Sequence, residues 1–248
     1  MDMIDLNCDI GENIGDDASI MPFITSANIA CGYHAGDKKT MRETVRLAKR
    51  YSVNVGAHPS WRDPEGFGRR EQALSSMTAV EALILEQVGA LNAIAEAEGV
   101  RLIHVKPHGA LYNQAAKAYP LAKAIAQAVK RFNAKLILVG LAGSKLIEAG
   151  VEAGLQIANE GFADRRYNPD GTLVSRDKPG AIIATPAEAA AHALELTQHG
   201  ILFDGKRIQI DTLCLHGDHP HATENAKLIR ALLQKQDRLA PISLPKKR

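Results

Sequence analysis

Short stretches of alternating polar and apolar residues recur along the chain. In L-I-H-V-K-P-H at 102–108, His104, Lys106 and His108 fall on one face of a predicted strand, because side chains of a strand alternate between its faces. The other face is apolar and suits contact with a helix layer. Pro107 cannot donate to a sheet ladder, so we expect regular pairing to end there. The pattern predicts a strand that carries two imidazoles and an amine at its carboxyl end.

The same alternation begins the chain, where Asp5, Asn7 and Asp9 share one face of a strand at 4–10. Further strands are predicted at 25–32, 53–57, 136–139, 155–160 and 211–215, and helices at 41–50, 78–98, 121–132, around 146–147, 185–200 and 222–236. Strands and helices thus alternate about seven times, which indicates parallel strands with crossover helices. No break in composition divides the chain, so we expect one domain over residues 1–248.

Polar residues at the predicted carboxyl ends of the strands favour a closed barrel. They are Asp9, His58, Lys106, Glu160 and His216, each on a different strand. In a β/α barrel these ends converge on one mouth, whereas an open sheet would spread them along a line. The sequence therefore predicts an α/β fold, a TIM-like (β/α) barrel of about seven parallel strands.

Composition narrows the classes of partner. The net charge of +2 and an aromatic content of 4% argue against nucleic acid binding. The three cysteines lie far apart and form no C-x-x-C, which indicates a reducing compartment. We see no signal peptide and no apolar run near the ~20 residues of a membrane span. We therefore expect a cytoplasmic protein without a membrane partner.

Ionisable residues gather at the strand ends and in the loops that follow. The candidate catalytic residues are Asp9, Glu12, His58, His104, Lys106, His108, Glu160, His216 and Asp218. Two chemistries suit them. One is general acid–base hydrolysis with Lys106 stabilising an oxyanion. The other is metal-assisted hydrolysis, with Asp9, His58, His104 and His216 as candidate ligands. No H-E-x-x-H motif is present, and the sequence does not decide between the two.

Two glycine-containing loops, 60–72 and 161–180, are rich in arginine. Over a barrel mouth such loops can hold a carboxylate or phosphate, although a solvated or subunit-facing surface explains them equally well. Candidate substrate- or phosphate-binding residues are Asn7, Asn28, His34, Arg69, Arg70, Asp164 and Arg165. The stretch G-L-A-G-S-K at 140–145 only partly matches the phosphate-binding P-loop pattern, so a conventional P-loop is excluded.

Several motifs together resemble one family. They are I-D-L-N-C-D-I-G-E at 4–12, S-A-N-I-A-C-G-Y-H-A-G-D at 26–37, V-G-A-H-P at 55–59, G-F-G-R-R at 66–70, H-V-K-P-H-G-A-L-Y-N at 104–113, L-V-G-L-A-G-S at 138–144, F-A-D-R-R-Y at 162–167, P-D-G-T-L-V at 169–174 and C-L-H-G-D at 214–218. The chain resembles the LamB/YcsF family, the A subunits of 5-oxoprolinase. The resemblance implies a barrel related to the glycoside hydrolase/deacetylase superfamily.

The resemblance also implies an activity. It is the hydrolysis of 5-oxo-L-proline (pyroglutamate) to L-glutamate with cleavage of ATP to ADP and phosphate, together with subunits B and C. ATP, with Mg²⁺, would be a cosubstrate. Because the chain lacks a P-loop, we expect activation largely on the partner subunits. We expect Asp9 or Glu160 as base, Lys106 and His108 as oxyanion or phosphate contacts, and Arg69, Arg70 and Arg165 as anion clamps.

Two other functions remain open at the level of sequence. One is a stand-alone metal-dependent deacetylase or amide hydrolase, which kinship of the fold favours. The other is a non-catalytic partner that binds pyroglutamate without turnover. Fold kinship alone does not distinguish them.

Overall fold

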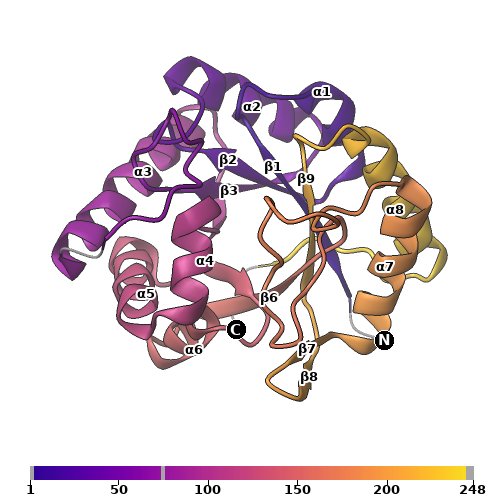
Figure 1. The fold of residues 1–248 in the computed structure, drawn as a ribbon. Helices are drawn as coiled ribbons and strands as arrows, with labels where there is room; N and C mark the ends of the chain where they lie inside the picture. The colour runs from indigo at the N-terminus through magenta and orange to yellow at the C-terminus, as the bar shows by residue number, and fades with distance from the viewer. Residues whose placement is uncertain (1–2, 74–75, 244–248) are drawn as a thin grey trace, which may run out of the picture.

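Seven parallel strands close into a barrel in the computed structural model, which describes residues 3–73 and 76–243. The strands follow the order β1 (Asp5–Ile10), β2 (Ser26–Ala30), β3 (Asn54–His58), β4 (Leu102–Val105), β5 (Ile137–Leu141), β6 (Gln156–Phe162) and β9 (Thr212–His216). Strand β9 pairs with both β1 and β6, so the barrel has no free edge (Figure 1). The predicted TIM-like barrel of about seven strands is confirmed.

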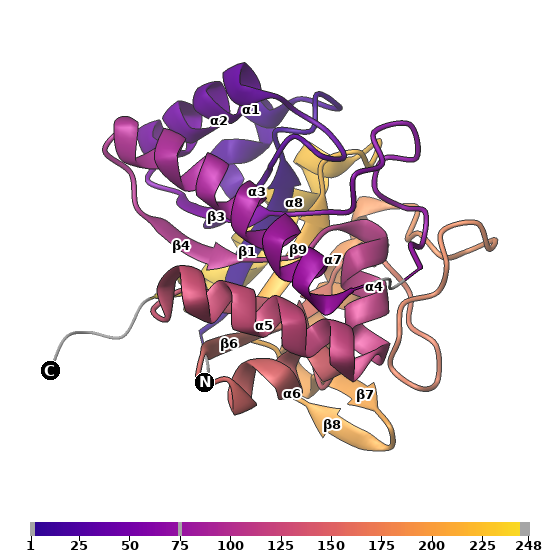
Figure 2. The same cartoon turned by 90° about the vertical axis from the view of Figure 1, so that its left-hand side faces the viewer.

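Helices surround the barrel on its outer side (Figures 1 and 2). They are α1 (Asp17–Ile20), η1 (Met21–Phe23, a 3₁₀ helix), α2 (Lys38–Arg50), α3 (Met77–Ala97), α4 (Gly109–Lys117), α5 (Tyr119–Asn133), α6 (Lys145–Glu152), α7 (Pro186–His199) and α8 (Ala222–Lys235). Every predicted helix is present. The start of α7 matches its sequence signal, because the Thr185 hydroxyl accepts a hydrogen bond from the Glu188 amide and Pro186 occupies the first turn.

Three short features have no clear signal in the sequence: α1, α4 and an antiparallel hairpin of β7 (Ile201–Phe203) and β8 (Lys206–Ile208). The sequence pattern predicts no helix over 109–117, because this alanine-rich segment has little periodic contrast and Pro120 separates it from the body of α5. The loop 161–180 is also more ordered than expected. Two isolated antiparallel β-bridges stabilise it, one between Tyr167 and Leu173 and one between Arg165 and Ile182.

Helix α3 has the length and composition of a membrane span. It has 21 residues and a mean hydropathy of 1.3 over its most apolar window, contrary to the expectation that no run approaches this length. In the structure Ile84, Val88 and Leu91 are fully buried, and the helix packs against α5, α2 and β3. It is a core helix of the barrel's outer layer.

The barrel interior is polar, whereas its outer face is apolar. On β1, Leu6, Cys8 and Ile10 belong to the main hydrophobic core. The intervening Asp5 points inward, where it accepts hydrogen bonds from Ser26 Oγ and Thr212 Oγ1, both at 2.6 Å. The predicted alternation on this strand is confirmed. It supplies the inward-facing groups from which the site is built.

Gly56 on β3 is required by the same interior packing. A Cβ at this position would overlap the imidazole of His104 on the neighbouring strand β4. We expect Gly56→Ala to lower the free energy of unfolding by about 2–3 kcal/mol, because overpacking a dense interior forces neighbours to move. Urea denaturation measures the change.

The matched control is Gly89→Ala on α3, where the nearest atom to the new methyl group is Phe132 Cε2 at 3.7 Å. There the substitution should stabilise, because alanine favours a helix over glycine by about 1 kcal/mol. Equal stability of the two variants would contradict the interior packing described here.

Candidate active site

A cavity of about 250 Å³ opens at the carboxyl end of the barrel. Seven of the nine predicted catalytic residues line it: Asp9, Glu12, His58, Lys106, His108, His216 and Asp218. The loop 161–180 contributes one wall through residues 172–176. The predicted convergence of the strand ends on one mouth is therefore observed, at a size that suits a small molecule.

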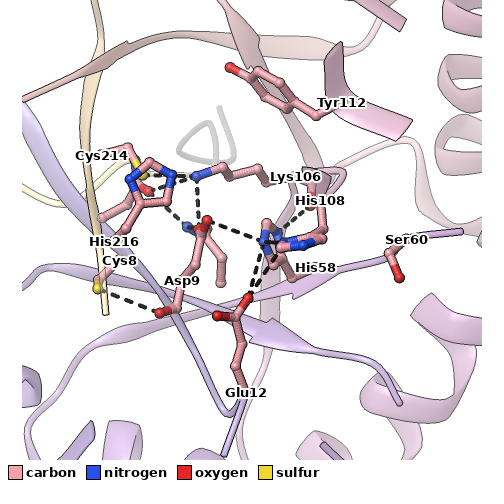
Figure 3. A network of polar contacts seen from close by, with 12 residues as sticks. Cys8, Asp9, Glu12, His58, Ser60, Lys106, His108, Tyr112, Cys214 and His216 are labelled. Carbon is pink, nitrogen blue, oxygen red and sulfur yellow. Dashed lines mark hydrogen bonds and ion pairs between the residues drawn. The ribbon is translucent and has the colours of Figure 1, made fainter. Parts of the chain in front are cut away.

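Lys106 lies at the floor of this cavity and is almost fully buried. Its ammonium Nζ is 2.8 Å from Asp9 Oδ1 and 3.0 Å from Cys214 Sγ (Figure 3), and 2.8 Å from Glu160 Oε1. Burial alone would lower the pKa of Lys106, but these neighbours raise it well above its usual range. The site thus contains a fixed positive charge held by two carboxylates.

The pKa values of the Asp9 and Glu12 carboxyl groups shift in opposite directions. Burial would raise the pKa of Asp9, but His58 and Lys106 hold it well below its usual range. Burial and the nearby charge of Asp9 instead raise the pKa of Glu12 well above its usual range. Asp9 is therefore an anion at neutral pH, while Glu12 lies where a proton or another cation is favoured.

Glu160 is fully buried beneath the cavity. Its Oε1 accepts from Asn7 Nδ2 at 3.1 Å in addition to Lys106, and its Oε2 accepts from the Tyr112 hydroxyl at 2.7 Å. Both oxygens are occupied and Glu160 does not line the cavity. Tyr112 is absent from the residues that the sequence predicts for the site. Tyr112 lies one helical turn after His108, so a prediction of helix α4 would have placed it near His108.

His34, His58 and His108 form a buried cluster with Glu12 at one side of the cavity. Figure 3 shows His58, His108 and Glu12 of this cluster. Glu12 Oε1 is 3.2 Å from His34 Nε2 and 3.4 Å from His108 Nδ1. His108 Nδ1 is 2.9 Å from His58 Nε2. The His34 and His108 rings stack in parallel with centroids 3.8 Å apart. The sequence predicts only a substrate contact for His34, and the structure places it with the catalytic candidates.

His216 and Asp218 line the opposite side of the cavity. Asp164 lies behind His216 and accepts from its Nδ1 at 2.9 Å and from its backbone amide at 3.0 Å, so Asp164 orients the ring. Asp218 holds Arg69 at 2.6 Å and Arg176 at 3.2 Å. Arg69 is therefore already paired. Asp164, which the sequence predicts as a substrate contact, supports His216 and lies outside the lining of this cavity, and its contact with substrate stays a prediction.

The predicted arginine clamps separate in the structure. Arg165 is buried, lines the cavity and donates from Nη2 to the Val174 carbonyl at 2.5 Å, while its Nε has no partner among the described residues. Burial and Arg176 lower the pKa of Arg165 to about 10. Arg70, by contrast, has a largely exposed side chain that pairs with Asp63, and it lies outside the cavity lining. Of the three predicted clamps, Arg69 and Arg165 line the cavity and Arg70 does not.

Asn7, Asn28 and His104 form a layer below the cavity rather than part of its surface. Asn28 Nδ2 donates to Asn7 Oδ1 at 2.7 Å and to Asp9 Oδ1 at 2.8 Å. His104 Nε2 donates to Asn28 Oδ1 at 2.7 Å. These hydrogen bonds position Asp9, and neither asparagine lines the cavity, so the substrate contact expected of the two asparagines stays a prediction.

Two groups of residues in the described part of the chain could hold a metal ion. One is Glu12, His34, His58 and His108, and the other is Asp9, Cys214 and His216. The four ligands considered from the sequence, Asp9, His58, His104 and His216, do not meet in one group, and His104 belongs to neither. Strand alternation places His104 on the correct face but does not give its depth.

Sequence comparison places the chain in a known family. The LamB/YcsF family model matches residues 4–245. This chain belongs to the LamB/YcsF family. A protein of Methylococcus capsulatus, named as the A subunit of 5-oxoprolinase, is 55% identical over 236 residues, which cover 92% of this chain and 90% of that protein.

Structural comparison agrees. The crystal structure of a lactam utilization protein from Thermus thermophilus matches with a TM-score of 0.88 and 43% identity, over 97% of this chain and 99% of that one. The catalytic domain of a peptidoglycan N-acetylglucosamine deacetylase from Eubacterium rectale matches with a TM-score of 0.52 at 10% identity, over 100% of this chain and 96% of that one. The latter likeness concerns the fold alone: the two chains share a barrel architecture.

The buried His104 makes stability depend on pH. Burial and the charge of Lys106 lower the pKa of His104 to about 3, from about 6.5 when unfolded. Between these values the unfolded chain binds more protons, so stability falls as the pH falls from 6.5 toward 3. The contribution is about 1.4 kcal/mol per pH unit. In urea titrations between pH 4 and 6, we expect His104→Gln to reduce the slope of the free energy of unfolding against pH by that amount.

The control is His221→Gln, which changes an exposed histidine on the surface and should leave the slope as in the parent. An unchanged slope for His104→Gln would show that His104 is not held neutral by the fold.

Proposed function

We propose that this protein is the A subunit of an ATP-dependent 5-oxoprolinase. With subunits B and C it would hydrolyse 5-oxo-L-proline to L-glutamate while ATP is cleaved to ADP and phosphate. Family membership and the relatives named as A subunits of 5-oxoprolinase support this proposal. The structural observation that carries it is the Asp9–Lys106 pair at the floor of a small cavity, with Arg165 on the cavity wall.

These groups complement the two ends of the substrate. 5-Oxo-L-proline carries a carboxylate and a lactam carbonyl on a five-membered ring. The Arg165 guanidinium has an Nε without a partner among the described residues and suits the carboxylate, because arginine donates several hydrogen bonds in a fixed plane. Lys106 at the floor suits the carbonyl oxygen, or a phosphate attached to it, since its positive charge stabilises the negative charge that develops there.

Asp9 is the base in this proposal, in preference to Glu160. Both oxygens of Glu160 are bound by neighbouring side chains and it has no contact with the cavity, whereas Asp9 lines the cavity and its low pKa keeps it ionised. Asp9 would take a proton from water as the water oxygen attacks the ring carbonyl carbon. When the C–N bond breaks, the same carboxyl group would return the proton to the ring nitrogen.

In this proposal ATP acts on the complex with subunits B and C rather than on this chain alone. A lactam is a stable amide, and transfer of the terminal phosphoryl group of ATP to its oxygen, with release of ADP, would make the ring carbon open to attack. Attack by water and cleavage of the C–N bond would then leave an acyl phosphate on the new carboxyl group, and a second water would hydrolyse it to glutamate and phosphate. The chain has no P-loop, so we place this activation, with Mg²⁺-ATP, largely on subunits B and C. Hydrolysis would then take place in the cavity of the present chain. We take residues 1–248 to form one domain. The need for ATP and three free, buried cysteines support a cytoplasmic location.

Reconstitution tests the proposal. The purified chain should release glutamate from 5-oxo-L-proline and ATP only when subunits B and C are present. Asp9→Asn and Lys106→Met should each lower kcat at least 100-fold, because each removes a group that acts on the reacting carbonyl. Lys39→Met, which removes an exposed lysine on α2, is the matched control and should keep full activity.

Circular dichroism of each variant establishes that it is folded. Two results would overturn the proposal: no glutamate from the folded parent with subunits B and C, or full activity in both Asp9→Asn and Lys106→Met. Activity of the chain alone on acetylated substrates would favour the deacetylase alternative.

A further inference from the structure

The orientation of the three clustered histidines follows from their outer partners. His58 Nδ1 lies 2.8 Å from the Lys106 carbonyl, and His108 Nε2 lies 2.9 Å from the Phe67 carbonyl. A carbonyl oxygen only accepts hydrogen bonds, so both ring nitrogens carry the proton. In the neutral ring the other nitrogen, His58 Nε2 or His108 Nδ1, is therefore a bare lone pair that faces into the cluster.

His34 is fixed in the same way. Its Nδ1 lies 2.8 Å from Ser60 Oγ, and the Ser60 hydroxyl donates its own proton to the Trp61 carbonyl at 2.9 Å. Ser60 Oγ must accept from His34 Nδ1, which leaves His34 Nε2 bare and directed at Glu12. Such outer hydrogen bonds are typical of metal-binding histidines, because they fix the tautomer and the orientation of the ring.

Without a cation, the inward-facing atoms would repel one another. His58 Nε2 and His108 Nδ1 are 2.9 Å apart, and when both rings are neutral neither of these atoms carries a proton. The lowering of the Asp9 pKa by His58 belongs to the protonated form of that ring, in which Nε2 holds one proton and faces Asp9. Glu12 Oε1 adds a fourth acceptor, and Asp9 Oδ2 lies 3.3 Å from His58 Nε2.

The four donor atoms lie within 4.8 Å of one another, close enough to surround one tetrahedral ion after small movements. Ligands about 2.0–2.1 Å from a tetrahedral metal are about 3.3 Å from one another. The measured separations are 2.9 Å for His58–His108, 3.2 Å for His34–Glu12, 3.4 Å for His108–Glu12 and 4.0 Å for His58–Glu12. A single proton can join only two of these atoms, whereas one metal ion can join all four.

We propose that Glu12, His34, His58 and His108 bind one divalent transition-metal ion, of the class of Zn²⁺ or Co²⁺. Three imidazoles and one carboxylate favour these ions over Mg²⁺ or Ca²⁺, which prefer oxygen ligands. Glu12, His58 and His108 line the cavity, so the ion would face it beside Asp9. The proposal concerns binding and does not depend on the proposed function, although an ion here would adjoin the same substrate cavity.

Cobalt titration of the full chain tests this site. After chelation and dialysis, Co²⁺ followed by calorimetry and visible absorption should bind at one equivalent, with ligand-field bands and no thiolate charge-transfer band, and Zn²⁺ should displace it. His34→Gln should abolish stoichiometric binding. Ser60→Ala keeps all four ligands but removes an outer hydrogen bond, so we expect it to weaken binding about 10–100-fold.

Two controls separate this cluster from other sites. Cys214→Ser removes a member of the second group of possible ligands, and His221→Gln removes an exposed histidine. Both should bind one equivalent with parent affinity. The proposal fails if the folded parent binds no Co²⁺ or Zn²⁺ stoichiometrically, which would mean that protons fill the cluster. It also fails if Ser60→Ala binds as the parent does, or if Cys214→Ser loses the ion.

Discussion

The ammonium of Lys106, held between Asp9 and Glu160 inside the barrel, is the interaction on which the site depends. A buried charge is tolerated only when it is paired and hydrogen-bonded, and here two carboxylates on two other strands supply that pairing. Strands β1 and β6 are thereby tied to the residue that follows β4, at one depth. The same contacts leave Asp9 ionised and facing the cavity. The ion pairs that stabilise the buried Lys106 therefore also supply the carboxylate that acts in the site.

The barrel interior around Lys106 and Asp9 has a supporting layer below and a cavity lined by reactive groups above. Asn7, Asn28 and His104 lie beneath and satisfy the inner oxygen of Asp9 or one another. Above, one wall carries the histidine cluster and the other carries His216 and the arginines. The supporting layer is rigid because each side chain has a fixed partner, and this rigidity holds the reactive groups at their distances. A metal ion in the cluster would add a second fixed positive charge beside Lys106.

Much of this arrangement is predictable from the sequence, because the period of two on β1 and β4 determines which residues face the barrel interior. Closure then brings Asp9, His58, Lys106 and His216 to one mouth. The depth of each residue is not predictable, since it depends on the stagger between strands. His104 therefore lies below the cavity although it shares a face with Lys106.

Loop residues are harder still. Arg69 and Arg70 are neighbours in sequence, yet one reaches the cavity and the other pairs with Asp63, because loop geometry follows contacts that no periodicity encodes. Tyr112 escapes prediction because the sequence pattern does not indicate α4. The tautomers of the clustered histidines depend on the carbonyls of Lys106 and Phe67 and on Ser60, groups that only the folded chain brings within reach.

The most direct test of this account is a crystal structure of the protein with 5-oxo-L-proline. The account predicts the ligand in the barrel-mouth cavity, with its carboxylate on Arg165 and its lactam oxygen within hydrogen-bonding distance of Lys106 Nζ. Asp9 should lie beside the ring carbonyl. A ligand bound outside this cavity, or inside it with the lactam turned away from both Asp9 and Lys106, would contradict the account.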